Sequence, residues 1–203
     1  SPTRSMNFLL DTNFGARWLN GPEVTDLPPY LFNFLIDVGH TIDVTDGLTV
    51  DGMISPGWFT DFSNKGPGSL RLPWHVVTHY KLDDDWFWET GVADLARDDI
   101  HILPVIGAVY APKDADVRLD LVFPKPKAAR RIREFESGDS VWATLGGELG
   151  GGSWAIGRAD HSSDVVTYRD YRLTTGLETR THNGQIARIE LGWVFNRAVE
   201  YRS

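Results

Sequence analysis

The chain of 203 residues contains no cysteine and only two methionines. The lack of cysteine excludes a disulfide scaffold and a thiolate metal site. The chain also has no continuous apolar run of the roughly 18 residues that a transmembrane helix requires, so such a helix is excluded. Its mean hydropathy of -0.26 agrees with that exclusion. A membrane barrel stays open, because its signal is spread over alternating positions.

Positive charge is scarce as well. Lys and Arg number 20 against 28 Asp and Glu, which gives a net charge of -8. Because the basic residues are spread along the chain, no nucleic-acid partner is expected. The exception is the basic run 124–133, a candidate for contacting lipopolysaccharide-like headgroups or for funnelling anions, with a solvated loop rim as the simpler interpretation. The chain begins with neither a signal peptide nor Met, so we expect a mature or trimmed product.

The segment 186–201 alternates between an apolar and a polar face over an unusual length. Period-two alternation indicates a strand with two unlike faces. Soluble strands have about five or six residues, whereas crossing a bilayer at a tilt takes roughly nine to eleven. Similar contrast recurs in the segments 6–18, 30–40, 69–82 and 165–180. These patterns favour a transmembrane β-barrel.

Turn signals divide the chain at regular intervals, and short turns alternate with longer loops, as is typical of outer-membrane barrels. The clearest turn is Asn183-Gly184, a hairpin signal. The strands between turns are expected to start at Met6, Tyr30, Leu48, Ser69, Trp86, Ile100, Val117, Ala128, Ser140, Val165 and Ile186. Because bacterial barrels usually close with an even number of strands, we predict about twelve, with one outside this sequence. If the basic segment from Ala128 is a loop, ten remain.

The predicted fold is therefore all-β: one antiparallel transmembrane β-barrel of the outer-membrane type that occupies residues 1–203. Tryptophans near the strand ends would form the aromatic girdles of such a barrel, with a Trp-rich soluble core as the alternative. The predicted membrane-interface aromatics are Trp18, Trp58, Trp86, Trp88, Trp142 and Trp154.

Ionisable residues share the polar faces and must meet water or one another if the apolar faces meet lipid. The predicted lumen-lining residues are Arg71, His75, His79, Glu148, Asp170, Arg172, Glu178, Arg188 and Glu190. A wet lumen would form a pore whose selectivity follows its charges, whereas a fully paired lumen would form a closed barrel. Barrels of about eight strands are filled and those of sixteen or more are open, so twelve leaves both alternatives standing.

No catalytic residue, metal site or cofactor is predicted, and the chain is not expected to be an enzyme. Ser153 lies in a glycine-rich run that lacks the second glycine and the helix of a nucleophile elbow. His75 and His79 share a face but lie about 13 Å apart along a strand, too far for one metal. Asp94, Asp98 and Asp99 could meet calcium, but a solvated loop with a local arginine contact is the preferred interpretation.

Several motifs resemble an uncharacterised family of predicted planctomycete-type outer-membrane β-barrel proteins. These motifs are LGWVFNRAVEYR from Leu191, GELGGGSWAI from Gly147, DVVTYRDYRL from Asp164, SPGWFTDF from Ser55 and LVFPKP from Leu121. The resemblance covers about residues 21–203 and implies a barrel in the bacterial outer membrane, without a known substrate. Its members continue past the equivalent of Tyr201 with another strand, which implies the strand expected above.

The sequence thus predicts a porin-like channel of the bacterial outer membrane, for passive diffusion of small polar solutes or ions, with the lipid bilayer as its partner. Two alternatives stay open. One is a non-conducting barrel that serves as a structural anchor or surface-interaction module. The other is a soluble, lipocalin-like binding barrel with its apolar faces turned inward. A homo-oligomer is also left open.

Overall fold

The computed structural model describes residues 6–19, 26–66 and 68–203. Strands dominate this part of the chain, and none of its segments is a helix long and apolar enough to cross a membrane. Its thirteen strands are β1 (Met6–Trp18), β2 (Tyr30–Thr45), β3 (Leu48–Ile54), β4 (Gly57–Thr60), β5 (Leu70–Arg71), β6 (Trp74–Lys81), β7 (Trp86–Asp94), β8 (Leu103–Tyr110), β9 (Val117–Phe123), β10 (Lys127–Glu134), β11 (Ser140–Gly157), β12 (Ser163–Arg180) and β13 (Ile186–Tyr201).

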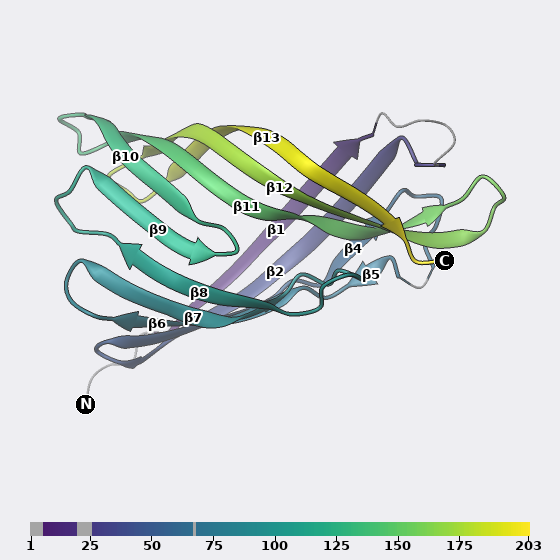
Figure 1. Cartoon of the computed structure of the whole chain (residues 1–203). Helices are drawn as coiled ribbons and strands as arrows, with labels where there is room; N and C mark the ends of the chain where they lie inside the picture. The colour runs from purple at the N-terminus through teal and green to yellow at the C-terminus, as the bar shows by residue number, and fades with distance from the viewer. Residues whose placement is uncertain (1–5, 20–25, 67) are drawn as a thin grey trace.

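The strands form one curved sheet that closes into a barrel (Figure 1). Neighbours along the sheet are antiparallel, in the order β13-β12-β11-β10-β9-β8-β7-β6-β3-β2-β4-β5, with β1 paired to β2. The ring closes where β4 meets β11 in parallel, through Thr60 and Ala155. Nine strands of the described chain make up this ring, and β1, β5, β12 and β13 extend the sheet beyond it without taking part in the closure. The all-β barrel expected from the sequence is confirmed.

The strand count differs from the predicted ten to twelve. The thirteen strands of the described residues arise because two expected segments are each interrupted, one between β3 and β4 and one between β5 and β6. Pro56 lies in the first break and Pro73 in the second, and proline has no N–H to give to a ladder. Both carbonyls still accept backbone hydrogen bonds, Pro56 from Ile36 at 3.0 Å and Pro73 from Ser55 at 2.8 Å. The doubtful basic segment is a strand, β10.

The apolar face of β12 points outward. Leu173 and Leu177 on this strand are 52% and 53% exposed, whereas Asp170 and Glu178 on the same strand are buried. The alternating pattern did not say which face is outside, and the structure places the apolar one there. A lipocalin-like barrel requires the reverse arrangement.

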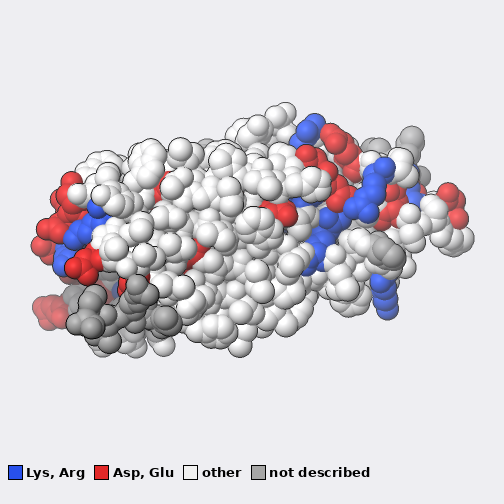
Figure 2. Space-filling model, turned by 90° about the horizontal axis from the view of Figure 1, so that it is seen from below, with Lys and Arg blue, Asp and Glu red and all other residues white. Residues whose placement is uncertain are grey.

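Charged side chains gather at the two ends of the molecule on the face shown in Figure 2, and few lie between them. The turns and loops between strands are rich in carboxylates, for example Asp83 and Asp85 between β6 and β7 and Asp160 between β11 and β12. A charge-poor band therefore separates two charged ends on this face.

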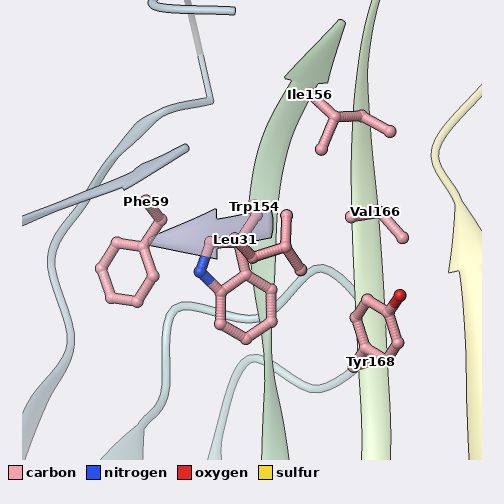
Figure 3. Close-up of a cluster of buried hydrophobic side chains, with 6 residues drawn as sticks. All are labelled: Leu31, Phe59, Trp154, Ile156, Val166 and Tyr168. Atoms are coloured by element: carbon pink, nitrogen blue, oxygen red, sulfur yellow. The ribbon is translucent and has the colours of Figure 1, made fainter. Parts of the chain in front are cut away.

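An apolar cluster fills the inside of the barrel near one end (Figure 3). Its buried members come from four strands and are Leu31, Phe59, Trp154, Ile156, Val166 and Tyr168. The Trp154 ring lies 6.2 Å from that of Phe59 and 6.1 Å from that of Tyr168, centroid to centroid. The cluster lies where β4 joins β11, so it packs the junction that closes the ring.

Strands β8 and β9 approach each other closely at Gly107. A Cβ at this position would overlap the carbonyl oxygen of Leu121 and lie 2.6 Å from the Cα of Val122, both backbone atoms of β9. We expect Gly107→Ala to push β9 away and to lower the free energy of unfolding by about 1 to 3 kcal/mol. Urea unfolding of the detergent-refolded protein measures this loss. Gly52→Ala on β3 is the control, because the atom nearest to its added Cβ would be the His75 carbonyl oxygen, 3.9 Å away. Equal losses would contradict the steric argument.

Candidate functional site

Ionisable side chains on the inner face form pairs across neighbouring strands. His75 Nε2 lies 2.7 Å from Asp51 Oδ1, and His79 Nδ1 lies 3.0 Å from Glu89 Oε1. The two predicted lumen histidines thus meet separate carboxylates, as expected for hydrogen-bonded histidines. Among the described residues, no three His, Cys, Asp or Glu are grouped so that they could hold a metal ion.

Glu178 on β12 is the centre of the densest charge cluster. Its side chain is 1% exposed and accepts hydrogen bonds from Lys127 Nζ at 2.8 Å, Arg180 Nε at 2.6 Å and Arg188 Nε at 2.9 Å. The sequence singled out Glu178 and Arg188 but missed Lys127 and Arg180. Arg180 could have been found, since it lies two residues from Glu178 and therefore on the same face. Lys127 could not, because its proximity depends on how β10 is placed beside β11.

A second cluster surrounds Arg172 on β12. Its Nε donates to Asp170 Oδ1 at 2.8 Å, and its Nη1 lies 3.8 Å from Glu148 Oε1. Lys125 Nζ lies 3.6 Å from the other oxygen of Glu148. A Cβ on Gly150 would lie 2.5 Å from Arg172 Nε, so the bare backbone leaves room for this cluster. The glycine at this position therefore lets the bulky Arg172 side chain pack against bare backbone.

The remaining predicted lumen residues have different surroundings. Glu190 lies 3.7 Å from Arg188, at the edge of the Glu178 cluster. Arg71, in contrast, belongs to neither cluster. It contacts the loop after β7 and donates hydrogen bonds to the Ala96 carbonyl at 2.6 Å and to Asp98 at 2.9 Å.

Arginines occupy the acidic loop after β7. Asp99 pairs with Arg97 at 2.5 Å, and Asp98 accepts from Arg71 and from Arg202, whose Nη2 lies 2.6 Å away. Asp94 accepts from the backbone N–H of Ala96. The local arginine contact expected for this loop is present, but the solvated loop is not, since the side chains of Arg97 and Asp99 are only 0% and 9% exposed.

Ser153 contributes to the attachment of the same loop. Its hydroxyl accepts from the Asp98 N–H at 3.0 Å and lies 2.7 Å from the Thr167 hydroxyl. Arg97, 1% exposed, donates from Nη1 to the Gly150 carbonyl at 2.9 Å. These contacts give Ser153 a structural role.

The Asp98 contacts predict a pH-dependent step in stability. Burial raises the pKa of Asp98, but hydrogen bonds from Arg71 and Arg202 outweigh it, and the pKa lies below its usual value of 3.8. The stabilisation is therefore complete above the ordinary Asp pKa and is lost as pH falls through the lowered one. We expect Asp98→Asn to be less stable than the native chain at about pH 6, with the difference vanishing toward about pH 2.

Urea unfolding followed by tryptophan fluorescence across this pH range would measure that difference. Asp46→Asn, at an exposed turn carboxylate, is the matched control and should track the native protein at every pH. A difference for Asp98→Asn that does not change with pH would contradict the linkage.

The predicted interface tryptophans divide into two groups. Trp18, Trp86 and Trp88 are exposed on the outer face and Trp58 is half-buried. The expectation is wrong for two others: Trp142 is 8% exposed and Trp154 is 1% exposed. Being near a strand start or a loop does not decide whether a side chain points into or out of the barrel, because successive side chains along a strand point to opposite faces. Trp142 packs inside under the Arg180 guanidinium, 4.6 Å from the ring centroid, and Trp154 belongs to the inner apolar cluster.

The basic run 124–133 carries acidic partners along its length. Besides Lys125 and Lys127, Arg131 donates to Asp116 at 2.8 Å and lies 3.1 Å from Glu134. Its contact with anionic headgroups stays a prediction.

A cavity of about 540 Å³ with both charged and apolar lining opens at the turn end of the barrel, away from the apolar cluster. Its charged lining includes His79, Lys81, Glu89 and Arg118. A space of this size with charged groups at its border can hold a small polar molecule. No family model matches the chain, and no curated protein or solved structure matches it either.

Proposed function

We propose that the protein is a membrane-embedded β-barrel of the outer-membrane type whose lumen is closed at one end, and that it serves as an envelope anchor or surface-interaction module. The observation that carries this proposal is the inverted distribution of its residues. Large apolar side chains cover the outside of the strands, and ion pairs fill the inside.

Lipid is the surrounding that this exterior fits best. Soluble monomers rarely expose contiguous apolar patches above a few hundred Å². Here outward side chains of neighbouring strands join into one surface, as where Leu173 pairs with Trp193 and Leu177 with Ile189. The charge-poor band between two charged ends in Figure 2 fits a bilayer with its two polar interfaces. The resemblance to planctomycete-type barrels supports the same location and stays a prediction.

The interior favours a closed lumen over an open one. The apolar cluster around Trp154 occupies one end, and hydrated ions do not cross a packed apolar constriction readily. Many of the lumen charges already have partners, as in the Glu178 and Arg172 clusters. Charges that neutralise one another attract or repel a passing solute only weakly, so they give a pore little selectivity.

A porin-like channel for small polar solutes or ions is the second candidate. The cavity of about 540 Å³ favours it, because this cavity would serve as the vestibule of a pore. Passage would then require the apolar cluster to rearrange.

Planar-bilayer recording from the full, detergent-refolded chain distinguishes the two functions. Insertion is established first, by flotation of the protein with liposomes after an alkaline wash. We expect inserted protein to give no conductance steps; discrete steps would overturn the closed lumen and support the porin-like channel. A chain that stays monomeric in water without detergent and does not float with liposomes would overturn the membrane proposal as a whole.

A further inference from the structure

A cavity of about 300 Å³ lies where the end of β1 meets the inner faces of β11, β12 and β13. It is separate from the 540 Å³ cavity at the other end. Its charged lining is Arg17, Asp170, Arg172 and Arg197, and the Tyr168 side chain also borders it. Three arginines and one carboxylate therefore border one small space.

The single carboxylate is already neutralised. Asp170 accepts from Arg172 through both oxygens, from Nε at 2.8 Å and from Nη2 at 3.4 Å. Arg17 has a neutral hydrogen-bond partner, Asn33 at 3.3 Å, and its guanidinium lies 4.4 Å from the Trp154 ring centroid. Within the described residues, neither Arg17 nor Arg197 forms an ion pair with a carboxylate. The cavity thus holds two cations in excess.

The two excess cations also act on each other. Arg17 lies within electrostatic range of Arg172 and Arg197, and also of the carboxylates of Asp170 and Glu148, both of which are already in contact with Arg172. Like charges near a partly buried space are unfavourable unless an anion joins them. Arginine is always charged, so it cannot relieve this repulsion by losing a proton.

A buried hydroxyl adds a further donor at the same cavity. Tyr168 is 5% exposed, and its hydroxyl has no hydrogen-bond partner among the described atoms. Figure 3 shows this side chain on β12 beside Trp154, with its oxygen at the far end of the ring. A buried hydroxyl without a partner is costly, and a bound acceptor would satisfy it.

We propose that this cavity binds a small organic anion. Its carboxylate lies between Arg17 and Arg197 and accepts from the Tyr168 hydroxyl, since guanidinium groups suit the planar geometry of a carboxylate. Its apolar part packs against Leu19 and Val194. The volume is at the lower limit of typical ligand pockets, about 300 Å³, and this restricts the ligand to a compact molecule such as an aromatic or short aliphatic carboxylate.

Titration of the full, detergent-refolded chain with benzoate tests the site, by calorimetry and by fluorescence of Trp154 beside Arg17. Benzyl alcohol is the neutral analogue, and inorganic phosphate is the anion without an apolar part. We expect saturable benzoate binding that weakens with salt, and no saturable binding of the other two. If benzyl alcohol binds as tightly as benzoate, the proposal that the ligand is an anion is wrong. If phosphate binds as tightly as benzoate, the proposal that the ligand has an organic part is wrong.

Two substitutions connect this binding to the named residues. Arg197→Gln removes an exposed cation and should leave the fold intact while weakening benzoate at least about tenfold. Tyr168→Phe should weaken it less. Arg169→Gln is the matched control, because Arg169 lies on β12 but pairs with Glu200 at 2.8 Å, outside the cavity. Unchanged affinity in Arg197→Gln, with the native spectrum retained, would overturn the site. The measurement needs neither a bilayer nor conductance, so its result is independent of the proposed function.

Discussion

Glu178→Ala is expected to lower the free energy of unfolding by about 3 kcal/mol. The substitution leaves Lys127, Arg180 and Arg188 facing one another around a space from which their shared carboxylate has gone. Removing one partner of a buried pair is costly because the other charges remain desolvated. We take the lower end of the usual range because these cations keep side-chain exposures of 21%, 30% and 40%.

Urea unfolding in detergent micelles, followed by tryptophan fluorescence, measures this loss. Glu190→Ala serves as the control, since Glu190 is 36% exposed and reaches Arg188 only at 3.7 Å. Its loss should stay below about 1 kcal/mol, the range of exposed pairs. Equal losses for the two variants would mean that the Glu178 cluster does not hold β10, β12 and β13 together.

Trp154→Ala is expected to lower the free energy of unfolding by about 3 to 5 kcal/mol. The ring is 1% exposed and packs against Phe59 and Tyr168, so its removal leaves a cavity that the closed ring cannot readily collapse. It also removes the surface on which the Arg17 guanidinium rests. If this cluster closes the lumen, the same variant should show conductance steps that the native protein lacks.

Trp193→Ala is the matched tryptophan control for both measurements. Trp193 is 74% exposed on the outer face of β13, so its removal creates no inner cavity. We expect little change in stability in micelles and no conductance. An equally destabilised Trp193→Ala would show that the loss reflects tryptophan removal in general. Trp154→Ala that unfolds more easily but remains silent in bilayers would place the closure of the lumen elsewhere.

The apolar cluster and the proposed anion site lie side by side. Tyr168 belongs to the cluster and also lines the 300 Å³ cavity, and Arg17 joins the cavity to Trp154. An anion that draws Arg17 toward Arg197 would therefore act on the Trp154 ring directly. Conductance measured with and without benzoate would show whether occupancy of the site alters the closed end.

Local pattern was sufficient to find the strands. Alternation along the chain predicted β1, β2 and β13 with their first residues, because a strand with unlike faces leaves a period of two in the sequence. The Asn183-Gly184 signal predicted the turn into β13, and Gly184 has the positive φ, 86°, that such turns require. The sequence shows the two prolines that split expected segments, Pro56 and Pro73. Whether a proline interrupts a strand, however, depends on whether the neighbouring strands continue past it.

The sequence alone determined that this is an all-β chain whose strands have one apolar and one ionisable face, and it placed Glu178, Arg172 and Asp170 on the ionisable one. Tertiary structure decided which face is outside, that β4 meets β11 to close the ring, and that Trp142 and Trp154 lie inside. It also decided the partners: Lys127 meets Glu178 from 51 residues away. The physical reason is that periodicity is a property of one strand, whereas curvature, closure and ion pairing depend on which distant strands become neighbours.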